Sequence, residues 1–230
     1  MRLLVGLGNP GSGHSNNRHN LGFMAAESIV QRHGLGSWRT KFQGQMTQGQ
    51  LGGDNIVVLK PATYMNESGR AVSEAMSFYK LDLDDVIVFY DEIELAPGKI
   101  RVRKGGGHAG HNGIRSLVSH IGEAFWRVRM GVGHPGNKDR VSGYVLQDFG
   151  KADSTWVTTL VDATADATPL LIEGEDNRFM TDVAQAMRDV DTPPSPRDAK
   201  ANKNEGEIEM GFNCGIVGLP NVGKSTLLML

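Results

Sequence analysis

The chain has 230 residues, of which 39% are hydrophobic, so it can bury the core of one sizeable domain. Its formal net charge of −2 excludes the overall basic bias that marks many nucleic-acid-binding proteins. The single cysteine, Cys214, excludes an intramolecular disulfide, and no apolar run has the length of a membrane span or a signal peptide, so a soluble cytoplasmic protein is expected.

The N-terminal part of the chain predicts a strand, a polar loop and a helix. Residues 3–7 form an apolar run closed by glycines, which is typical of a buried strand. A polar stretch that contains His19 follows. Apolar side chains then recur every four positions from Leu21 to Ile29, which predicts an amphipathic helix that ends near Gly34.

Further strands follow along the chain. Residues 55–59 and 86–90 are apolar and rich in β-branched side chains, which predicts two buried strands, and Asp91 stands at the end of the second. Residues 41–53 are polar and predict a solvated strand and turn. Asn66 precedes a helical pattern and is placed to cap that helix.

The segment from residue 99 to residue 129 has the strongest local charge, with seven Lys or Arg side chains against one acid, Glu123. Residues 99–103 and 126–132 alternate basic and apolar side chains, so each predicts a strand with one cationic face. Such a basic window is a candidate surface for a phosphate-bearing ligand.

Between these two strands lies the glycine loop, residues 105–113, which reads GGGHAGHNG. Its glycines permit positive φ, and a helical apolar pattern follows it. Asn112 is therefore expected at a helix start, beside unpaired N–H groups that favour negative charge. The loop by itself fits a ligand site and a solvent-exposed turn about equally well.

The C-terminal part predicts helices and then a break in the fold. Residues 155–171 and 177–187 carry helical patterns that are interrupted around Pro169 and Gly174. Strands that alternate with helices predict a single α/β domain over residues 1–188. Residues 189–209 are polar and proline-rich, which predicts a disordered linker.

Polar side chains at the ends of the predicted strands are candidates for one site. Ligands of α/β sheets bind outside the carboxyl ends of the strands, where Asn9, Asn66 and Asp91 are expected to converge. His19 is either an exposed loop residue or the partner of Asp91. In the second case the carboxylate fixes the imidazole tautomer and leaves the other nitrogen to deprotonate water.

Two other motifs carry weaker signals. Residues 6–11 match the G-x-G-x-x-G fingerprint, but the polar residues that follow do not predict the helix that a dinucleotide site requires. His108 and His111 form H-x-x-H, yet no cysteine or H-E-x-x-H helix accompanies them, so no metal is expected.

Six motifs occur in the order found in bacterial peptidyl-tRNA hydrolases, and the chain resembles that family over about residues 1–188. They are VGLGNPG (residues 5–11), RHN (18–20), KPATYMNESG (60–69), DEIELAPGKIRVR (91–103), GGGHAGHNG (105–113) and FWRVRMGVGHPG (125–136). The resemblance implies a monomeric α/β enzyme with a mixed sheet surrounded by helices. It also implies a metal-independent enzyme that cleaves the ester between peptide and tRNA.

The resemblance also assigns roles by motif position. His19 is the implied general base and Asp91 its orienting partner. The side chains implied to hold the ester, the peptide backbone, the water or the oxyanion are Asn9, Tyr64, Asn66, His111 and Asn112. Arg103 and Arg129 occupy the positions that clamp a tRNA phosphate, where the family often has lysine at the first.

Residues 210–230 resemble the truncated start of an Obg-like GTPase, because residues 218–225 match G-x-x-x-x-G-K-[ST]. The chain stops before any Mg²⁺-holding acid, so this segment is expected to be non-functional. Two alternatives to a hydrolase therefore stay open here. They are an RNA-binding protein that keeps the fold without catalysis, and a nucleotide-binding GTPase fragment.

Overall fold

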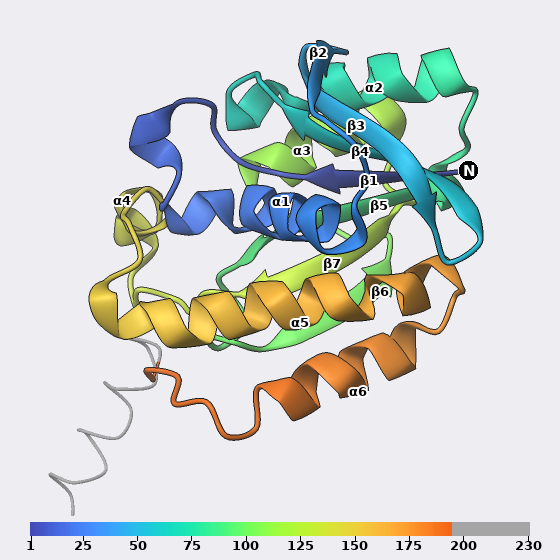
Figure 1. Ribbon diagram of the computed structural model, residues 1–230. Coiled ribbons are helices and arrows are strands. Elements are labelled where there is room, and N and C mark those ends of the chain that lie inside the picture. The colour runs from blue at the N-terminus through green and yellow to red at the C-terminus, as the bar shows by residue number, and fades with distance from the viewer. Residues whose placement is uncertain (195–230) are drawn as a thin grey trace, which may run out of the picture.

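The computed structural model describes residues 1–194, and within them seven strands form one mixed sheet in the order β2-β3-β4-β1-β5-β7-β6 (Figure 1). The strands are β1 (Arg2–Gly6), β2 (Arg39–Lys41), β3 (Gly44–Leu51), β4 (Asp54–Pro61), β5 (Val86–Glu92), β6 (Ile100–Lys104) and β7 (Trp126–Gly131). The helices are α1 (Leu21–His33), α2 (Ser68–Tyr79), α3 (Asn112–Ile121), α4 (Val141–Val145), α5 (Ser154–Ile172) and α6 (Asp176–Ala186). The prediction of a mixed α/β domain is confirmed.

The direction of the strands determines where a site can form. Strand β1 pairs in parallel with β4 and with β5, and β5 pairs in parallel with β7. The outer pairs, β2 with β3, β3 with β4 and β6 with β7, are antiparallel. The carboxyl ends of β1, β4, β5 and β7 therefore lie along one edge of the sheet, and the loops that follow them meet there.

Helices cover both faces of the sheet, as Figure 1 shows. Helices α1, α5 and α6 pack on one face against side chains such as Phe89 and Val128. Helices α2 and α3 pack on the other face against sheet side chains such as Val5 and Val88. These side chains are fully buried. Burial of each contributes about 1.5–3 kcal/mol, so the two layers hold the strand ends firmly.

A close approach between α1 and the sheet positions the segment that carries His19. A Cβ atom on Gly22, in the first turn of α1, would lie 2.3 Å from the carbonyl oxygen of Phe89 on β5. Only glycine permits this spacing, so the start of α1 lies directly against the central strands. The residues just before α1 are thereby brought next to the end of β5.

The expected interruption at Pro169 is wrong, because α5 continues through this residue to Ile172. Proline cannot donate to the carbonyl of Ala165 four residues earlier. His33 of α1 donates its Nε2–H to that oxygen instead, at 2.8 Å. The break at Gly174, where φ is +83°, is confirmed and separates α5 from α6.

The prediction that Asn66 caps the following helix is also wrong. Asn66 lies in a short 3₁₀ helix, Met65–Glu67, and α2 begins after Glu67 with no side-chain cap. The backbone is already turning before α2 starts, so the side chain of Asn66 is exposed and not engaged with the first turn. It is thus available at the sheet edge.

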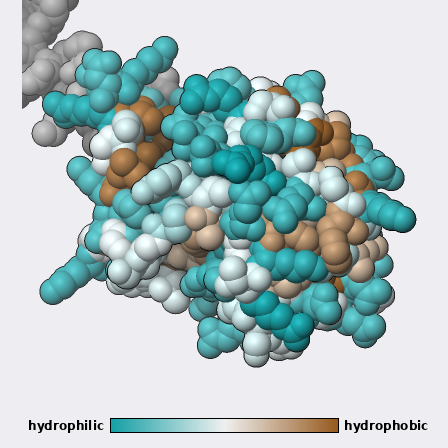
Figure 2. All heavy atoms as spheres, turned by 90° about the horizontal axis from the view of Figure 1, so that it is seen from above, coloured by the Kyte–Doolittle hydropathy of each residue, from teal (hydrophilic) through white to brown (hydrophobic). Residues whose placement is uncertain are grey.

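The described structure extends slightly past the predicted domain boundary. Val190, at the beginning of the predicted linker, packs against the core on the α5 face. The linker beyond residue 194 and the P-loop-like segment, residues 210–230, lie outside the described residues. No helix within residues 1–194 is long and apolar enough to cross a membrane. The face seen in Figure 2 is mostly hydrophilic, with separate hydrophobic patches.

Candidate active site

A cleft of about 830 Å³ opens at the carboxyl edge of the sheet, between the loops that follow the parallel strands and α4. Seven residues predicted from the sequence line it: Asn9, His19, Tyr64, Asn66, Asp91, His111 and Asn112. The expected convergence of side chains from the ends of β1, β4 and β5 is therefore confirmed. The glycine loop and α4 both contribute to the wall of the cleft.

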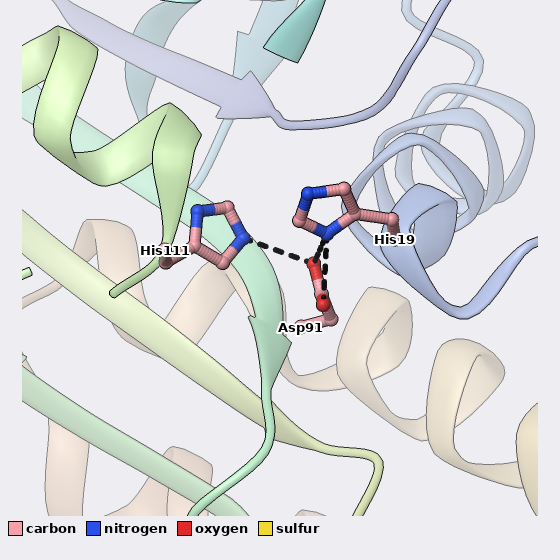
Figure 3. Close-up of side chains that lie close together, drawn as sticks. All are labelled: His19, Asp91 and His111. Carbon is pink, nitrogen blue, oxygen red and sulfur yellow. Dashed lines mark hydrogen bonds and ion pairs between the residues drawn. The ribbon is translucent and has the colours of Figure 1, made fainter. Parts of the chain in front are cut away.

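His19 and Asp91 form a direct hydrogen-bonded pair (Figure 3). His19 lies in the 3₁₀ turn Arg18–Asn20 and is 7% exposed, and Asp91 is 2% exposed at the end of β5. The Nδ1–H of His19 donates to Oδ1 of Asp91 at 2.9 Å and to Oδ2 at 3.0 Å. This bond leaves Nε2 as the acceptor on the opposite side of the ring, turned away from the carboxylate.

His111 binds the same carboxylate from the other side (Figure 3). Its Nε2 lies 3.0 Å from Oδ1 of Asp91, and its Nδ1 accepts from the backbone N–H groups of Gly113 and Ile114 at 3.1 and 3.2 Å. Because Nδ1 accepts, the ring proton must be on Nε2, where it is donated to Asp91. His111 is therefore fixed in one tautomer.

This arrangement corrects the expectation of unpaired N–H groups at the start of α3. The side chain of His111 is the N-cap of α3 and fills the position that an anion would occupy. Asn112 is the first residue of the helix, as predicted, and its side chain is exposed at the cleft. The glycine loop is thus joined to Asp91 by the side chain of His111.

The two imidazoles control the protonation of Asp91, and Asp91 controls that of His19. Burial by itself would raise the pKa of Asp91, but the charges and hydrogen bonds of His19 and His111 hold it well below its usual range. Burial acts to lower the pKa of His19, yet the charge of Asp91 and its hydrogen bond outweigh that effect and raise it above 6.5. Asp91 thus stays ionised while His19 titrates.

Two asparagines present amide donors to the same cleft. Oδ1 of Asn9 accepts from the backbone N–H of Met65 at 2.9 Å, and Oδ1 of Asn112 accepts from Nη2 of Arg115 at 2.7 Å. In both residues the oxygen is engaged by the protein, so Nδ2 is the group left for a ligand. Asn20 fixes the backbone of Asn9 through two further hydrogen bonds of 2.9 Å. The site can therefore donate to a carbonyl oxygen or an oxyanion.

The H-x-x-H motif is not assembled as a pair of metal ligands. His108 is exposed, and its Nδ1 accepts from the N–H of Gly110 at 3.1 Å, whereas both ring nitrogens of His111 are engaged as described above. In residues 1–194 the only group of ligand-type atoms close enough to share an ion is His19, Asp91 and His111, whose atoms lie within 4.8 Å of one another. In this cluster the hydrogen bonds already pair every donor with the carboxylate.

The arginines predicted to hold phosphate lie on β6 and β7, beside the glycine loop. In the register of this pair Arg103 is opposite Arg127 and Arg101 is opposite Arg129, so Arg103 and Arg129 share one face, as expected. Nε of Arg129 donates to Oε2 of the buried Glu92 at 2.9 Å, which fixes its guanidinium. Arg127 lies on the same cationic face, but it is 0% exposed.

Sequence reasoning missed residues that are contributed from distant parts of the chain. Val145 and Leu146, at the end of α4, line the cleft. Arg18, next to His19, places its guanidinium over the rings of Tyr144 and Phe149, at 4.6 and 5.2 Å from their centroids, and so joins this wall to the segment that carries His19. The position of Arg18 beside His19 was the only available signal, because its partners are more than 120 residues away.

The fold and the cleft define an α/β protein that can activate water with a histidine–carboxylate pair and stabilise negative charge with amide donors. The described residues that line the cleft include no cysteine, and the one serine among them, Ser142, does not lie in a G-x-S-x-G motif. This is the chemistry of a hydrolase that uses one activated water molecule.

Comparisons with known proteins identify the family. The family model for peptidyl-tRNA hydrolase matches residues 3–191. Peptidyl-tRNA hydrolase from Parvibaculum lavamentivorans is 56% identical over 208 residues, covering 90% of this chain and all of that protein. The enzyme from Dinoroseobacter shibae is 53% identical and covers 88% of each chain. This chain therefore belongs to the peptidyl-tRNA hydrolase family.

Solved structures agree with this assignment. The crystal structure of peptidyl-tRNA hydrolase from Acinetobacter baumannii matches with a TM-score of 0.75 and 36% identity, covering 85% of this chain and 96% of that one. A complex of peptidyl-tRNA hydrolase with N-propanol gives the same TM-score at 38% identity, covering 80% and 94%. The mixed sheet and its helices are thus the fold of that family.

Proposed function

We propose that this protein hydrolyses the ester bond between peptide and tRNA in peptidyl-tRNA, which releases both for recycling after premature drop-off or stalling of the ribosome. The observation that carries the proposal is the His19–Asp91 pair, with Nε2 of His19 turned away from Asp91. Family membership supports the substrate, because the relatives are named for it.

In this proposal His19 is the general base. Nε2 takes a proton from a water molecule, and the resulting hydroxide attacks the ester carbonyl. The ionised Asp91 holds the ring in the required tautomer and stabilises the imidazolium that forms. When the tetrahedral intermediate collapses, the ribose oxygen leaves with the proton carried by His19. No covalent bond to the protein is made.

The amide side chains bind the other parts of the substrate. Nδ2 of Asn112 donates to the oxyanion. Nδ2 of Asn9 donates to the peptide backbone, and the amide of Asn66 can both donate and accept there, so the backbone is held without selecting side chains. Tyr64, which is 68% exposed at the rim, provides an aromatic surface for the peptide. His111 contributes through Asp91 and not by direct proton transfer.

Arg103 and Arg129 bind a phosphate of the tRNA, which places the nucleic acid over the β6–β7 edge and the ester over the ends of β1 and β5. This orientation is supported by their common face next to the glycine loop. We further propose that the enzyme acts as a monomer, without a metal, in the cytoplasm where its substrate is produced.

The non-catalytic RNA-binding alternative is less well supported, because every predicted catalytic side chain is present and assembled. The decisive experiment is release of peptide from a purified peptidyl-tRNA, with His19→Ala as the matched variant. The parent protein should release peptide, whereas His19→Ala should bind the same tRNA without releasing it. Equal binding without release by the parent would establish the non-catalytic alternative.

A further inference from the structure

Arg127 is a buried cation to which the mechanism above gives no role. Its side chain is fully buried on β7, on the face of the sheet that carries α2 and α3. Both terminal nitrogens donate to main-chain carbonyl oxygens: Nη1 to Gly107 at 2.8 Å and Nη2 to Glu123 at 3.3 Å. Nε has no hydrogen-bond partner. Burying a guanidinium in this way costs free energy, so its retention calls for a compensating role.

The carbonyl of Gly107 is the only hydrogen-bonded link between the middle of the glycine loop and the sheet in the described structure. The loop begins at Gly105, whose N–H donates to the carbonyl of Phe125 at 2.9 Å. It then closes on itself, since the N–H of His111 donates to the carbonyl of His108 at 2.8 Å. Between these points Arg127 binds Gly107, and Arg103 reaches the same oxygen at 3.3 Å.

The far end of the loop is the part that enters the reaction centre. His111 donates to Asp91 at 3.0 Å and caps α3, and Asn112 follows it at the cleft. The ring of Tyr90 packs against His111 with centroids 5.0 Å apart. A displacement of Gly107 would therefore shift the short turn between His108 and His111. It would move His111, which contacts Asp91, and Asn112, which is proposed to contact the substrate.

We propose that Arg127 is a positioning residue for the hydrolytic reaction: it fixes the glycine loop through Gly107, so that His111 stays bonded to Asp91 and Asn112 stays at the cleft. This inference rests on the proposed roles of His19 and Asp91. Complete burial and the shorter bond to Gly107 distinguish Arg127 from the half-buried Arg103 and Arg129, although all three lie on one face of the same two strands.

The geometry explains why the anchor is an arginine. A loop with five glycines in nine residues has little stiffness of its own. The planar guanidinium lies 4.5 Å from the ring centroid of Phe125 and donates to two carbonyls at once. A lysine has a single ammonium at that point, so it can hold Gly107 but cannot bridge to Glu123 in the same plane.

The proposal predicts a change in the pH profile that loss of stability alone would not cause. The hydrogen bond from His111 delocalises part of the negative charge of Asp91 and weakens its attraction for the proton of His19. When the loop shifts and this bond is lost, Asp91 holds His19 in its protonated form more strongly. The pKa of His19 rises, and the acid limb of activity moves to higher pH.

The test measures kcat/KM against pH for Arg127→Met, Arg127→Lys and His111→Ala, with a short peptidyl ester that lacks the tRNA body. We expect the kcat/KM of Arg127→Met to fall by about 10- to 100-fold, as for a catalytic group displaced by about 1 Å. The acid limb of its pH profile should move to higher pH, as in His111→Ala. Arg127→Lys should recover part of the rate and of the shift. Val128→Ala, the neighbouring buried position on the opposite face, is the control for lost stability.

Two results would overturn the proposal. One is that Arg127→Met loses activity only in proportion to its melting temperature, as Val128→Ala does, with an unmoved acid limb. The other is that it affects only full-length peptidyl-tRNA, which would make Arg127 part of the tRNA surface. If Arg127→Met does not fold, the dependence of kcat/KM on pH is measured on Arg127→Lys, whose smaller loss and smaller shift test the proposal in its place. An active His19→Ala would instead refute the proposed function itself.

Discussion

The reaction centre and the β6–β7 edge use charged side chains in different ways. At the reaction centre, His19, Asp91 and His111 are almost buried and joined by hydrogen bonds of 2.9–3.0 Å. On the β6–β7 edge, Arg103 and Arg129 are half-buried, and they lie on an open strand pair next to a loop. The reaction centre fixes protons on particular nitrogen atoms, whereas the arginines of the β6–β7 edge spread positive charge over a wider surface. Changes in the first should therefore alter kcat, and changes in the second should alter KM.

The largest effect is expected for His19→Ala. Removal of the general base should lower kcat by about 10²–10⁴-fold and leave tRNA binding unchanged, because the side chain faces the ester and not the arginines. Single-turnover release of labelled peptide, together with a filter-binding measurement of tRNA, checks both parts. A kcat equal to that of the parent would remove His19 from the mechanism.

Asp91→Ala should have a smaller effect on kcat, near the 10²-fold end of the same range, because Asp91 orients and polarises but does not accept the proton. It should also lower stability, since two buried imidazoles lose their acceptor at about 1–3 kcal/mol each. The comparison uses kcat together with a urea unfolding curve. A greater loss of kcat than in His19→Ala would reverse the two roles.

The pH dependence should separate activity from stability. Protonated His19 cannot act as a base, so kcat should fall about tenfold per pH unit below an apparent pKa that lies above 6.5. Because the folded-state pKa is raised, the stabilisation from charged His19 is present below the unfolded value and lost as pH rises through the folded value. Activity should therefore rise over the interval in which this contribution to stability falls.

Asp91 makes the opposite contribution to stability. Its depressed pKa stabilises the fold above the unfolded value of the carboxyl, and this contribution is lost as pH falls. A rate profile from about pH 5 to about pH 9 checks the His19 trend, and melting temperatures extended down to about pH 2 check the Asp91 trend, which lies below the unfolded value of a carboxyl. An acid limb below pH 6 would contradict the raised pKa of His19.

Replacing Arg103 or Arg129 by Ala should raise KM for full-length peptidyl-tRNA severalfold and reduce the salt dependence by a slope of about one unit or less. Hydrolysis of a short ester without the clamped phosphate should be unaffected. Steady-state kinetics at several salt concentrations give the slope. If both substrates are affected alike, these arginines support the fold or the chemistry, and tRNA binds elsewhere.

The smallest effect is expected on chelation. Because Nδ1 of His19 and Nε2 of His111 are paired with Asp91 by hydrogen bonds, exhaustive treatment with EDTA should leave kcat within error of the untreated enzyme. Rates before and after dialysis, with and without added Zn²⁺, check this. Lost activity that Zn²⁺ restores would show that the cluster holds a metal.

The sequence by itself determined the class of fold and the main members of the site. Buried strands are visible in the sequence as short apolar runs, and helices as apolar side chains at helical spacing. Both patterns are local, so the α/β domain could be predicted from the order in which they alternate. Asn9, Asn66 and Asp91 follow predicted strands, so they could be predicted as neighbours, because the carboxyl ends of parallel strands lie at one edge of the sheet. The ordered motifs then assigned His19 and the glycine loop to one family.

Only the tertiary structure decided how these side chains share protons and which charges are buried. The donation of both imidazoles to Asp91 and the burial of Arg127 depend on contacts between residues distant in sequence. The continuation of α5 through Pro169 depends on His33, 136 residues earlier. Periodicity predicts which face of a strand a residue occupies, but solvent exposure is set by what packs on that face, and this is a property of the assembled fold.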